Sequence, residues 1–222
     1  MQIYATSDLH GALPDIHEQA SACDVVVIAG DVAPDVPVAQ QLAWLDGPFR
    51  NWLAEFDRRV IGIAGNHDFV FEKWGAACRE LMLPWTYLED SGTEHDGVRI
   101  WGLPWVPNLS NWAFHADDHR LDLYYDQVPL GTHVVVSHGP PQFHCDKTVP
   151  RYGSQNAGTP VANGMLLRVR PQAFICGHIH EGYGTATHRS KAVIYNVALN
   201  DENYDPINPP MVVNVTYPPP DK

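Results

Sequence analysis

Gln2-Ile-Tyr-Ala-Thr6 is an apolar run that passes directly into the polar stretch Ser7-Asp8-Leu9-His10-Gly11, and this junction decides the fold. The same kind of junction recurs at four places: Asp24–Ala29 before Gly30-Asp31, Arg59–Ala64 before Gly65-Asn66-His67-Asp68, Thr132–Val136 before Ser137-His138-Gly139, and Gln172–Cys176 before Gly177-His178-Ile179-His180. Short continuous apolar runs of this kind predict buried β-strands. We therefore expect strands that end in polar side chains.

Segments with helical spacing lie between these runs. The expected helices are Leu13–Ala22, Leu42–Phe56 with a break at Gly47-Pro48, Phe71–Leu81, and Thr159–Arg170. Asp96-Gly97 between two extended runs predicts a hairpin, and Tyr183–Ala186 with Ala192–Val197 predicts a second antiparallel pair. The alternation predicts an α/β fold with two mixed β-sheets packed as a sandwich and flanked by helices.

A chain of 222 residues suits one domain. We expect residues 1–200 to form it. Residues 201–222 are rich in Pro, Asn and Asp, and we expect them to add an arm in which Met211–Val215 is an edge strand of the same domain.

The charge and the cysteines exclude several classes of protein. Lys and Arg number 14 against 26 Asp and Glu, and this net charge of -12 argues against binding to long nucleic acid or anionic membranes. No apolar run is long enough to span a membrane. The 4 Cys form no Cys-x-x-Cys pair, which argues against a thiolate zinc site or a disulfide scaffold. The absence of a visible secretory signal predicts a cytoplasmic location.

The strand ends together present carboxylates, imidazoles and an amide. Each alone is a weak signal, because Asp-x-His or Asn-His-Asp is commonly a polar turn. Their recurrence at strand ends, where α/β proteins bind ligands, predicts a single cluster. His178 and His180 alternate and are expected to project from the same side of an extended segment. The candidate metal ligands are Asp8, His10, Asp31, Asn66, His138, His178 and His180.

Oxygen and nitrogen ligands without thiolate favour Mn as the metal, with Fe, Zn, Mg or Ni as alternatives. The candidates exceed what one ion needs, so we expect two divalent ions that share one bridging carboxylate. Two such ions, ~3.5–4 Å apart, can stabilise both the attacking and the leaving oxygen of a displacement at phosphorus. The pattern therefore predicts hydrolysis of a phosphate ester.

These residues, in this order along the chain, resemble the signature of the calcineurin-like metallophosphoesterases. The MPPED-like branch, which has phosphodiesterase members, is resembled by four further stretches: Gly102-Leu-Pro-Trp105-Val-Pro107, Trp112-Ala-Phe114, Ser137-His-Gly-Pro-Pro141 and His180-Glu-Gly-Tyr-Gly184. The resemblance implies a four-layer αββα fold.

The resemblance also implies a role for each candidate. One metal would be bound by Asp8, His10 and His180, the other by Asn66, His138 and His178, and Asp31 would bridge them. A hydroxide between the ions would attack phosphorus. His67 would act as general acid or donate to a phosphate oxygen, Asn66 would also reach the phosphate, and Asp68 would orient His67 or cap its loop.

The segment between Gly92 and Tyr125 is the expected specificity element. Trp105 and Trp112 are candidates to stack on a nucleobase, whereas Trp101 is equally compatible with core packing. Glu181 is expected to line the same rim.

These observations predict a dinuclear phosphodiesterase that acts on small nucleotide phosphodiesters, cyclic nucleotides included. The alternatives are a phosphomonoesterase or protein phosphatase on the same centre and a non-catalytic scaffold. The scaffold is disfavoured because every ligand position is filled. The sequence leaves the physiological substrate, the native metal and the oligomeric state open, with a homodimer as one option.

Overall fold

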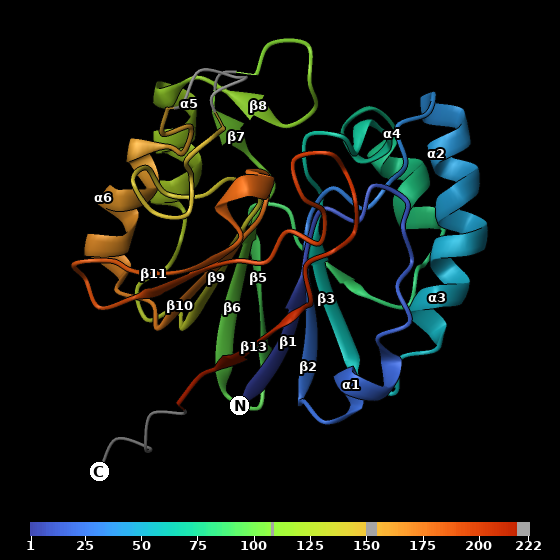
Figure 1. The fold of residues 1–222 in the computed structure, drawn as a ribbon, viewed down its shortest axis with the longest axis horizontal. Helices are drawn as coiled ribbons and strands as arrows, with labels where there is room; N and C mark the ends of the chain where they lie inside the picture. The colour runs from blue at the N-terminus through green and yellow to red at the C-terminus, as the bar shows by residue number, and fades with distance from the viewer. Residues whose placement is uncertain (108, 150–154, 217–222) are drawn as a thin grey trace.

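The computed structural model describes residues 1–107, 109–149 and 155–216, which form two facing β-sheets between helices (Figure 1). The first sheet has the order β13-β1-β2-β3-β4, and its pairs are parallel except that β13 runs antiparallel to β1. Its strands are β1 (Gln2–Thr6), β2 (Val25–Ala29), β3 (Arg59–Ile63), β4 (Thr86–Tyr87) and β13 (Met211–Asn214).

The second sheet has the order β11-β12-β10-β9-β6-β5 and is also mixed. Its inner pairs are parallel, and an antiparallel pair lies at each edge. These two edge pairs are the hairpins that the sequence predicted. Its strands are β5 (Ser91–His95), β6 (Val98–Leu103), β9 (Val134–Ser137), β10 (Ala173–Cys176), β11 (Gly184–Thr187) and β12 (Val193–Asn196). A separate short pair joins β7 (Val106–Pro107) to β8 (His115–Ala116).

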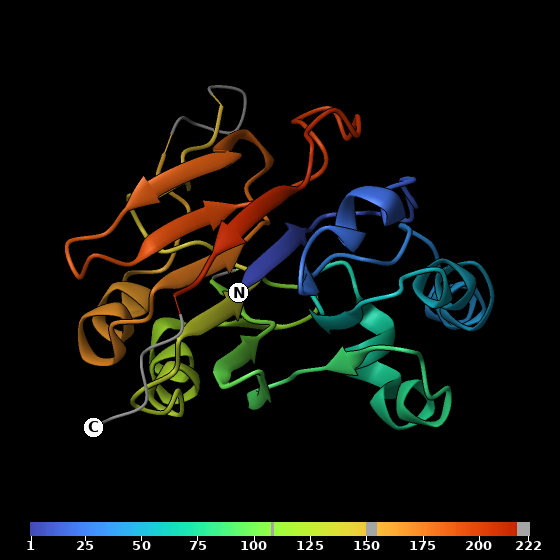
Figure 2. The same ribbon diagram turned by 90° about the horizontal axis from the view of Figure 1, so that it is seen from below.

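Helices cover the outer face of each sheet, and Figure 2 shows the same arrangement from below. The first sheet is covered by α1 (His17–Ser21), α2 (Val38–Trp44), α3 (Arg50–Ala54) and α4 (Phe69–Glu80), and the second by α5 (Asp118–Asp126) and α6 (Pro160–Val169). Two sheets with helices on both sides confirm the predicted fold class.

Alternation along the strands builds three apolar layers. In β2, Val25 and Val27 face the second sheet, where they pack with Ile100 and Ile175, while Val26 faces the helices. Side chains alternate across a strand, so a continuous apolar run fills both the space between the sheets and the space under the helices.

The helices differ from expectation in two places. Gly47-Pro48 does not break the helix, because a π-helical turn, η1 (Leu45–Phe49), joins α2 to α3. A wider turn accommodates the missing N–H of Pro48 and keeps Leu45 and Phe49 buried. The helix expected over Leu13–Ala22 is limited to α1.

The C-terminal segment folds back onto the first sheet. As expected, β13 is an edge strand, and it pairs along β1 from Gln2 to Ala5. Residues 217–222 of the expected arm lie outside the described residues. Among the described residues, no helix has the length and apolar character needed to cross a membrane.

Candidate metal centre

The candidate ligands lie where parallel strands of both sheets end, at one edge of the sandwich. Asp8 and His10 follow β1, Asp31 follows β2, Asn66 follows β3, and His138 follows β9. Several of these residues have left-handed backbone angles, with φ of 55° at Asp8, 45° at His10 and 51° at Asp31. This conformation is uncommon for residues other than Gly, and functional sites are where it concentrates. The chain turns sharply as each strand ends and directs the side chains into the cluster.

Glycines beside the ligands leave the space that the cluster occupies. A Cβ at Gly65 would collide with Asp31 Oδ1 and lie 2.6 Å from His138 Nε2. A Cβ at Gly177 would collide with the carboxylate of Asp8. The Gly residues seen before the polar residues at these strand ends are therefore required by close packing of side chains against the backbone.

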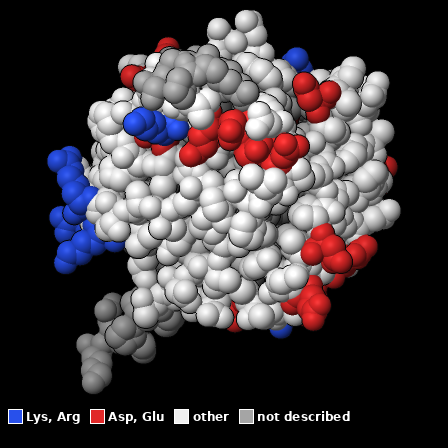
Figure 3. Space-filling view, in the orientation of Figure 1, with Lys and Arg blue, Asp and Glu red and all other residues white. Residues whose placement is uncertain are grey.

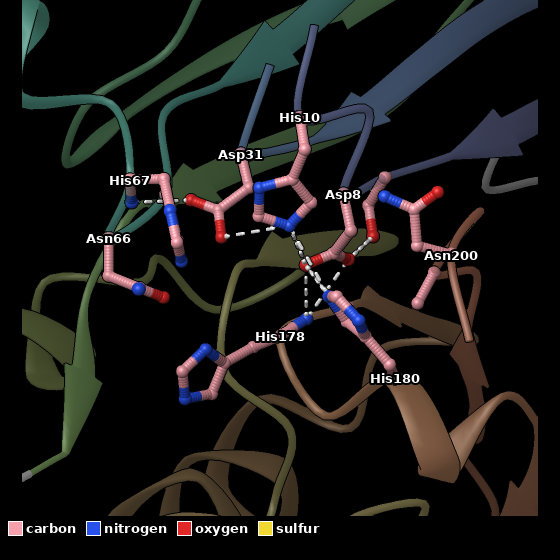
Figure 4. Close-up of polar contacts among 12 residues, drawn as sticks. Asp8, His10, Asp31, Asn66, His67, His178, His180 and Asn200 are labelled. Carbon is pink, nitrogen blue, oxygen red and sulfur yellow. Dashed lines mark hydrogen bonds and ion pairs between the residues drawn. The ribbon is translucent and has the colours of Figure 1, made fainter. Parts of the chain in front are cut away.

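The first group of ligands is formed by Asp8, His10 and His180 (Figure 4). His10 Nε2 lies 3.3 Å from His180 Nε2, and His180 Nε2 lies 3.4 Å from Asp8 Oδ1. Ligands on a tetrahedral ion at ~2.1 Å are about 3.4 Å apart, so these separations fit one cation. The three residues are those expected to share a metal.

The second group forms around Asp31. His138 Nε2 lies 3.2 Å from Asp31 Oδ2 and 3.1 Å from Asn66 Oδ1. Asp31 Oδ2 also lies 3.8 Å from His10 Nε2, so its carboxylate stands between the two groups. This is the position that a bridging ligand needs.

Backbone carbonyls hold two of the imidazoles in place. His138 Nδ1 donates to the carbonyl of Ala29 at 2.9 Å, and His180 Nδ1 donates to the carbonyl of Asp201 at 2.9 Å. Each bond fixes the tautomer and turns Nε2 towards the cluster, as is usual for metal-binding histidines.

His178 departs from the expected geometry. Its φ of 68° breaks the extended segment after β10, so it does not project beside His180. Its backbone N–H donates to both carboxylate oxygens of Asp8 at 3.0 Å, and its ring points away from that carboxylate (Figure 4). The ring lies 5.2 Å from the ring of His138, on the side of the second group. The structure therefore places the ring beside His138 in that group.

Burial and paired charges set the pKa values of the side chains in the cluster. Burial lowers the pKa of His138, but the carboxylate of Asp31 outweighs it and raises that pKa to about 9. Burial also lowers the pKa of His180, but the hydrogen bond to Asp8 and the charge of Asp8 outweigh burial and raise that pKa to about 9. Burial dominates at His10 and lowers its pKa to about 4. Protonated imidazoles thus balance the carboxylates, and a metal ion would displace those protons.

His67 lies at the edge of the cluster. Its backbone N–H donates to Asp31 Oδ1 at 2.7 Å, and its ring lies 4.5 Å from the ring of His10. A ring nitrogen of His67 also falls within 4.8 Å of ligand atoms of His10 and Asp31, although we expected His67 to be a catalytic residue and not a ligand.

Asp68 does not orient the ring of His67. Its carboxylate accepts from the backbone N–H groups of Val32, Ala33 and Gly65 at 2.8–3.2 Å, while His67 Nδ1 is buried without a hydrogen-bond partner among the described residues. Asp68 therefore ties together the loops after β2 and β3. It occupies the N-cap position of α4, but its side chain makes no capping hydrogen bond to that helix.

Comparison with known proteins supports the same chemistry. A family model described as Calcineurin-like phosphoesterase matches residues 1–182. The chain belongs to the calcineurin-like phosphoesterase family. It is 27% identical to Metallophosphoesterase domain-containing protein 1 of Homo sapiens over 96% of this chain and 70% of that protein. It is 34% identical to UPF0046 protein T07D4.2 of Caenorhabditis elegans over 64% of this chain and 36% of that protein.

Solved structures share the fold of this phosphoesterase at low sequence identity. The protein TT1561 of Thermus thermophilus has a TM-score of 0.61 and 14% identity, and the match covers 88% of each chain. A putative 5′-nucleotidase from Staphylococcus aureus has a TM-score of 0.57 and 15% identity, covering 96% of this chain and 53% of that one. These similarities establish the architecture alone.

The residues expected to bind substrate in this phosphoesterase separate into two sets. Trp112 lines a cavity of about 450 Å³ beside His10 and His67, which we call the aromatic cavity. Trp105 does not line it: its Nε1 donates to Asp90 at 2.9 Å and its ring stacks on Tyr124 at 4.0 Å. Trp105 is thus a packing residue between the second sheet and α5.

Glu181 lines a separate cavity of about 310 Å³, together with His178 and His180, which we call the acidic cavity. Its Oε1 accepts from the backbone N–H of Val149 at 3.3 Å. Glu181 therefore lies beside His178 and His180, but it lines a different cavity from Trp112.

Sequence reasoning missed Asn200 and Tyr204. The ring of Tyr204 lies 4.9 Å from the rings of His10 and His180, and it lines both cavities. Asn200 lines the aromatic cavity. The one local signal was the Asn- and Asp-rich composition of residues 201–208, which we interpreted as part of an arm, whereas Asn200 was the last residue of the expected domain. The pairing of β13 with β1 brings this segment back over the cluster.

Proposed function

We propose that this phosphoesterase hydrolyses small phosphodiesters, nucleotide esters and cyclic nucleotides among them, at a centre of two divalent cations. The observation that carries the proposal is the position of Asp31 between two groups of ligands, 3.8 Å from His10 and 3.2 Å from His138. A single cation would leave part of this set unused. The proposed ligands are Asp8, His10, Asp31, Asn66, His138, His178 and His180, with Mn favoured because the donors are nitrogen and oxygen.

The residues of the chain have distinct tasks in this proposal. When bound, two cations supply a nucleophile from water at neutral pH and stabilise charge on the phosphoryl oxygens. Asp31 fixes the spacing between the two ligand groups, and Asn66 is held next to both His138 and the substrate position. His67 lines the aromatic cavity and is the proposed donor of a proton to the leaving oxygen.

Acidic side chains at the rims of the two cavities favour a diester over a monoester. Acidic side chains border both cavities, with Asp35 at the first and Glu181 and Glu202 at the second. On the face of the molecule that Figure 3 draws, acidic side chains form a band across the upper part. A phosphomonoester carries about two negative charges near pH 7 and a diester one, so the diester is repelled less. The same repulsion, with a net charge of -12, disfavours long polynucleotides.

Parallel assays test the proposal. The metal-depleted protein is reconstituted separately with Mn, Fe, Zn, Mg and Ni and assayed on bis-p-nitrophenyl phosphate, p-nitrophenyl phosphate, and 2′,3′- and 3′,5′-cyclic nucleotides. We expect the diesters to be hydrolysed faster than the monoester and chelation to abolish activity. Faster hydrolysis of the monoester would favour the phosphomonoesterase alternative. Activity without bound metal would refute the two-metal proposal.

A further inference from the structure

The aromatic cavity is lined in part by side chains that have no task in the proposed chemistry at the cations. It opens beside His10 and His67 and is walled by Trp112 and Tyr204, with Asn200 in its lining. The two walls come from segments far apart in the sequence, and each is connected to a candidate metal ligand.

The Trp112 wall is connected to Asn66. The backbone N–H of Ala113 donates to the carbonyl of Asn66 at 3.1 Å, and the ring of Trp112 lies 4.3 Å from that of His67. Phe69 stacks on the indole with the ring centres 6.0 Å apart. Trp112 therefore keeps a fixed position relative to the second ligand group.

The Tyr204 wall is connected to His180. The carbonyl of Asp201 accepts both from His180 Nδ1 at 2.9 Å and from the backbone N–H of Tyr204 at 3.0 Å. The carboxylate of Asp201 also accepts from the backbone N–H groups of Asn203 and Asp205. This turn holds Tyr204 at a φ of 66° with 52% of its surface exposed. These bonds fix the backbone that carries the exposed ring of Tyr204 beside the cavity.

Asn200 supplies an unused polar group. Its side chain is buried, with the residue 2% exposed, and its Oδ1 has no hydrogen-bond partner among the described residues. Buried acceptors are nearly always paired, so this one is open to a donor from a ligand in the cavity. Asp35 offers a second acceptor at the rim of the same cavity.

We propose that Trp112 and Tyr204 form an aromatic clamp that selects esters with a flat, uncharged ring bearing N–H groups, and that Asn200 accepts a hydrogen bond from that ring. The proposal rests on the proposed function for the position of the phosphate, at the cations beside His10. Two aromatic side chains in the lining provide contact area for a flat ring, while the acceptors distinguish an amino-substituted nucleobase from an aryl group that has no N–H.

Binding measurements test the clamp without depending on turnover. Calorimetry compares adenosine 5′-monophosphate with ribose 5-phosphate, which lacks the base, on protein of measured metal content. We expect the first to bind about tenfold or more tightly, the scale of a base stacked on an aromatic ring. The ratio of the two affinities should fall below about threefold in Tyr204→Asn and in Trp112→Leu. Asn is chosen at position 204 because it tolerates the left-handed backbone there. Asn200→Leu should reduce it less, because both rings remain.

Two variants serve as matched controls. Tyr204→Phe keeps the ring and should keep the ratio. Phe143→Leu removes another exposed ring, 68% exposed and outside the aromatic cavity, and should leave the ratio unchanged. Equal affinity of the two probes for the parent protein, or an unchanged ratio in both Tyr204→Asn and Trp112→Leu, would overturn the clamp. Failure of the parent protein to hydrolyse any ester while the ratio persists would instead refute the proposed function alone.

Discussion

Replacement of Gly65 by Ala tests the metal centre without removing any ligand. Gly65 follows β3, and its backbone does not lie in the left-handed region, so Ala can adopt its conformation. The added methyl would point into the cluster, where it collides with Asp31 Oδ1 and lies 2.6 Å from His138 Nε2. The substitution therefore acts on the candidate bridging ligand and on a neighbouring imidazole together.

The magnitude follows from the overlap. Non-bonded carbon contacts are comfortable at about 3.5–4.0 Å, so the imidazole of His138 would have to move by about 1 Å. Metal–ligand distances tolerate only about 0.2 Å, and loss of a supporting contact alone costs about 10–100-fold in affinity. We expect Gly65→Ala to lose at least about 100-fold in metal affinity. Overpacking should also destabilise the metal-free protein by about 1–3 kcal/mol.

Metal content after reconstitution measures the loss of metal affinity. Thermal unfolding with and without metal measures the loss of stability. Gly164→Ala in α6 is the matched control, because a Cβ there meets nothing within 4 Å. It should bind metal normally and gain about 0.5–1 kcal/mol in stability from replacement of a helical glycine. Two ions bound to folded Gly65→Ala with parental affinity would show that Asp31 and His138 are not ligands.

Three further predictions concern single side chains. Asp31→Asn should lower the occupancy of both cations and abolish turnover while the protein stays folded; normal activity with two ions by elemental analysis would show that Asp31 is not the bridge. His67→Ala should slow hydrolysis of cyclic nucleotides by about 10²–10⁴-fold and of p-nitrophenyl esters much less, because nitrophenolate leaves without a proton; equal losses in parallel assays would exclude the acid role, and loss of a metal would make His67 a ligand. Burial raises the pKa of Asp90 to about 6, above its unfolded value of about 3.9, so its protonated form favours folding below about pH 4 and this contribution is lost as the pH rises through about 6. Asp90→Asn should therefore raise the melting temperature at about pH 8 but not at about pH 4, and melting curves at both pH values will show whether it does.

The strand ends were predictable because one rule governs them all. Parallel strands place their carboxyl ends at a common edge, so residues that follow separate apolar runs must approach one another in space. Asp8, Asp31, Asn66 and His138 obey this rule, although they are as much as 130 residues apart in the chain. The side-chain chemistry at that edge then indicated metal binding without any knowledge of loop conformation.

The orientation of His178 and the roles of the tryptophans were not predictable in this way. Strand periodicity predicts side-chain direction only while the backbone is extended. His178 itself adopts a left-handed conformation shortly after β10 ends, so the periodicity no longer applies there. Trp105 and Trp112 occur in the same loop-rich segment, and composition does not distinguish the one that packs on Tyr124 from the one that faces His67. That distinction depends on α5, which covers the second sheet beside Trp105.

Tyr204 shows why the boundary at residue 200 concealed part of the site. The expected domain ended there, and the composition beyond it indicated an arm. The carbonyl of Asp201 nevertheless holds His180 Nδ1, so the last segment of the chain determines the orientation of a ligand whose strand belongs to the second sheet. Because β13 pairs with β1, the same segment is anchored beside the strand that leads to Asp8. The C-terminal residues therefore connect both ends of the ligand set, and a variant that shortens the chain before Asn200 would alter the metal centre as well as the cavity beside it.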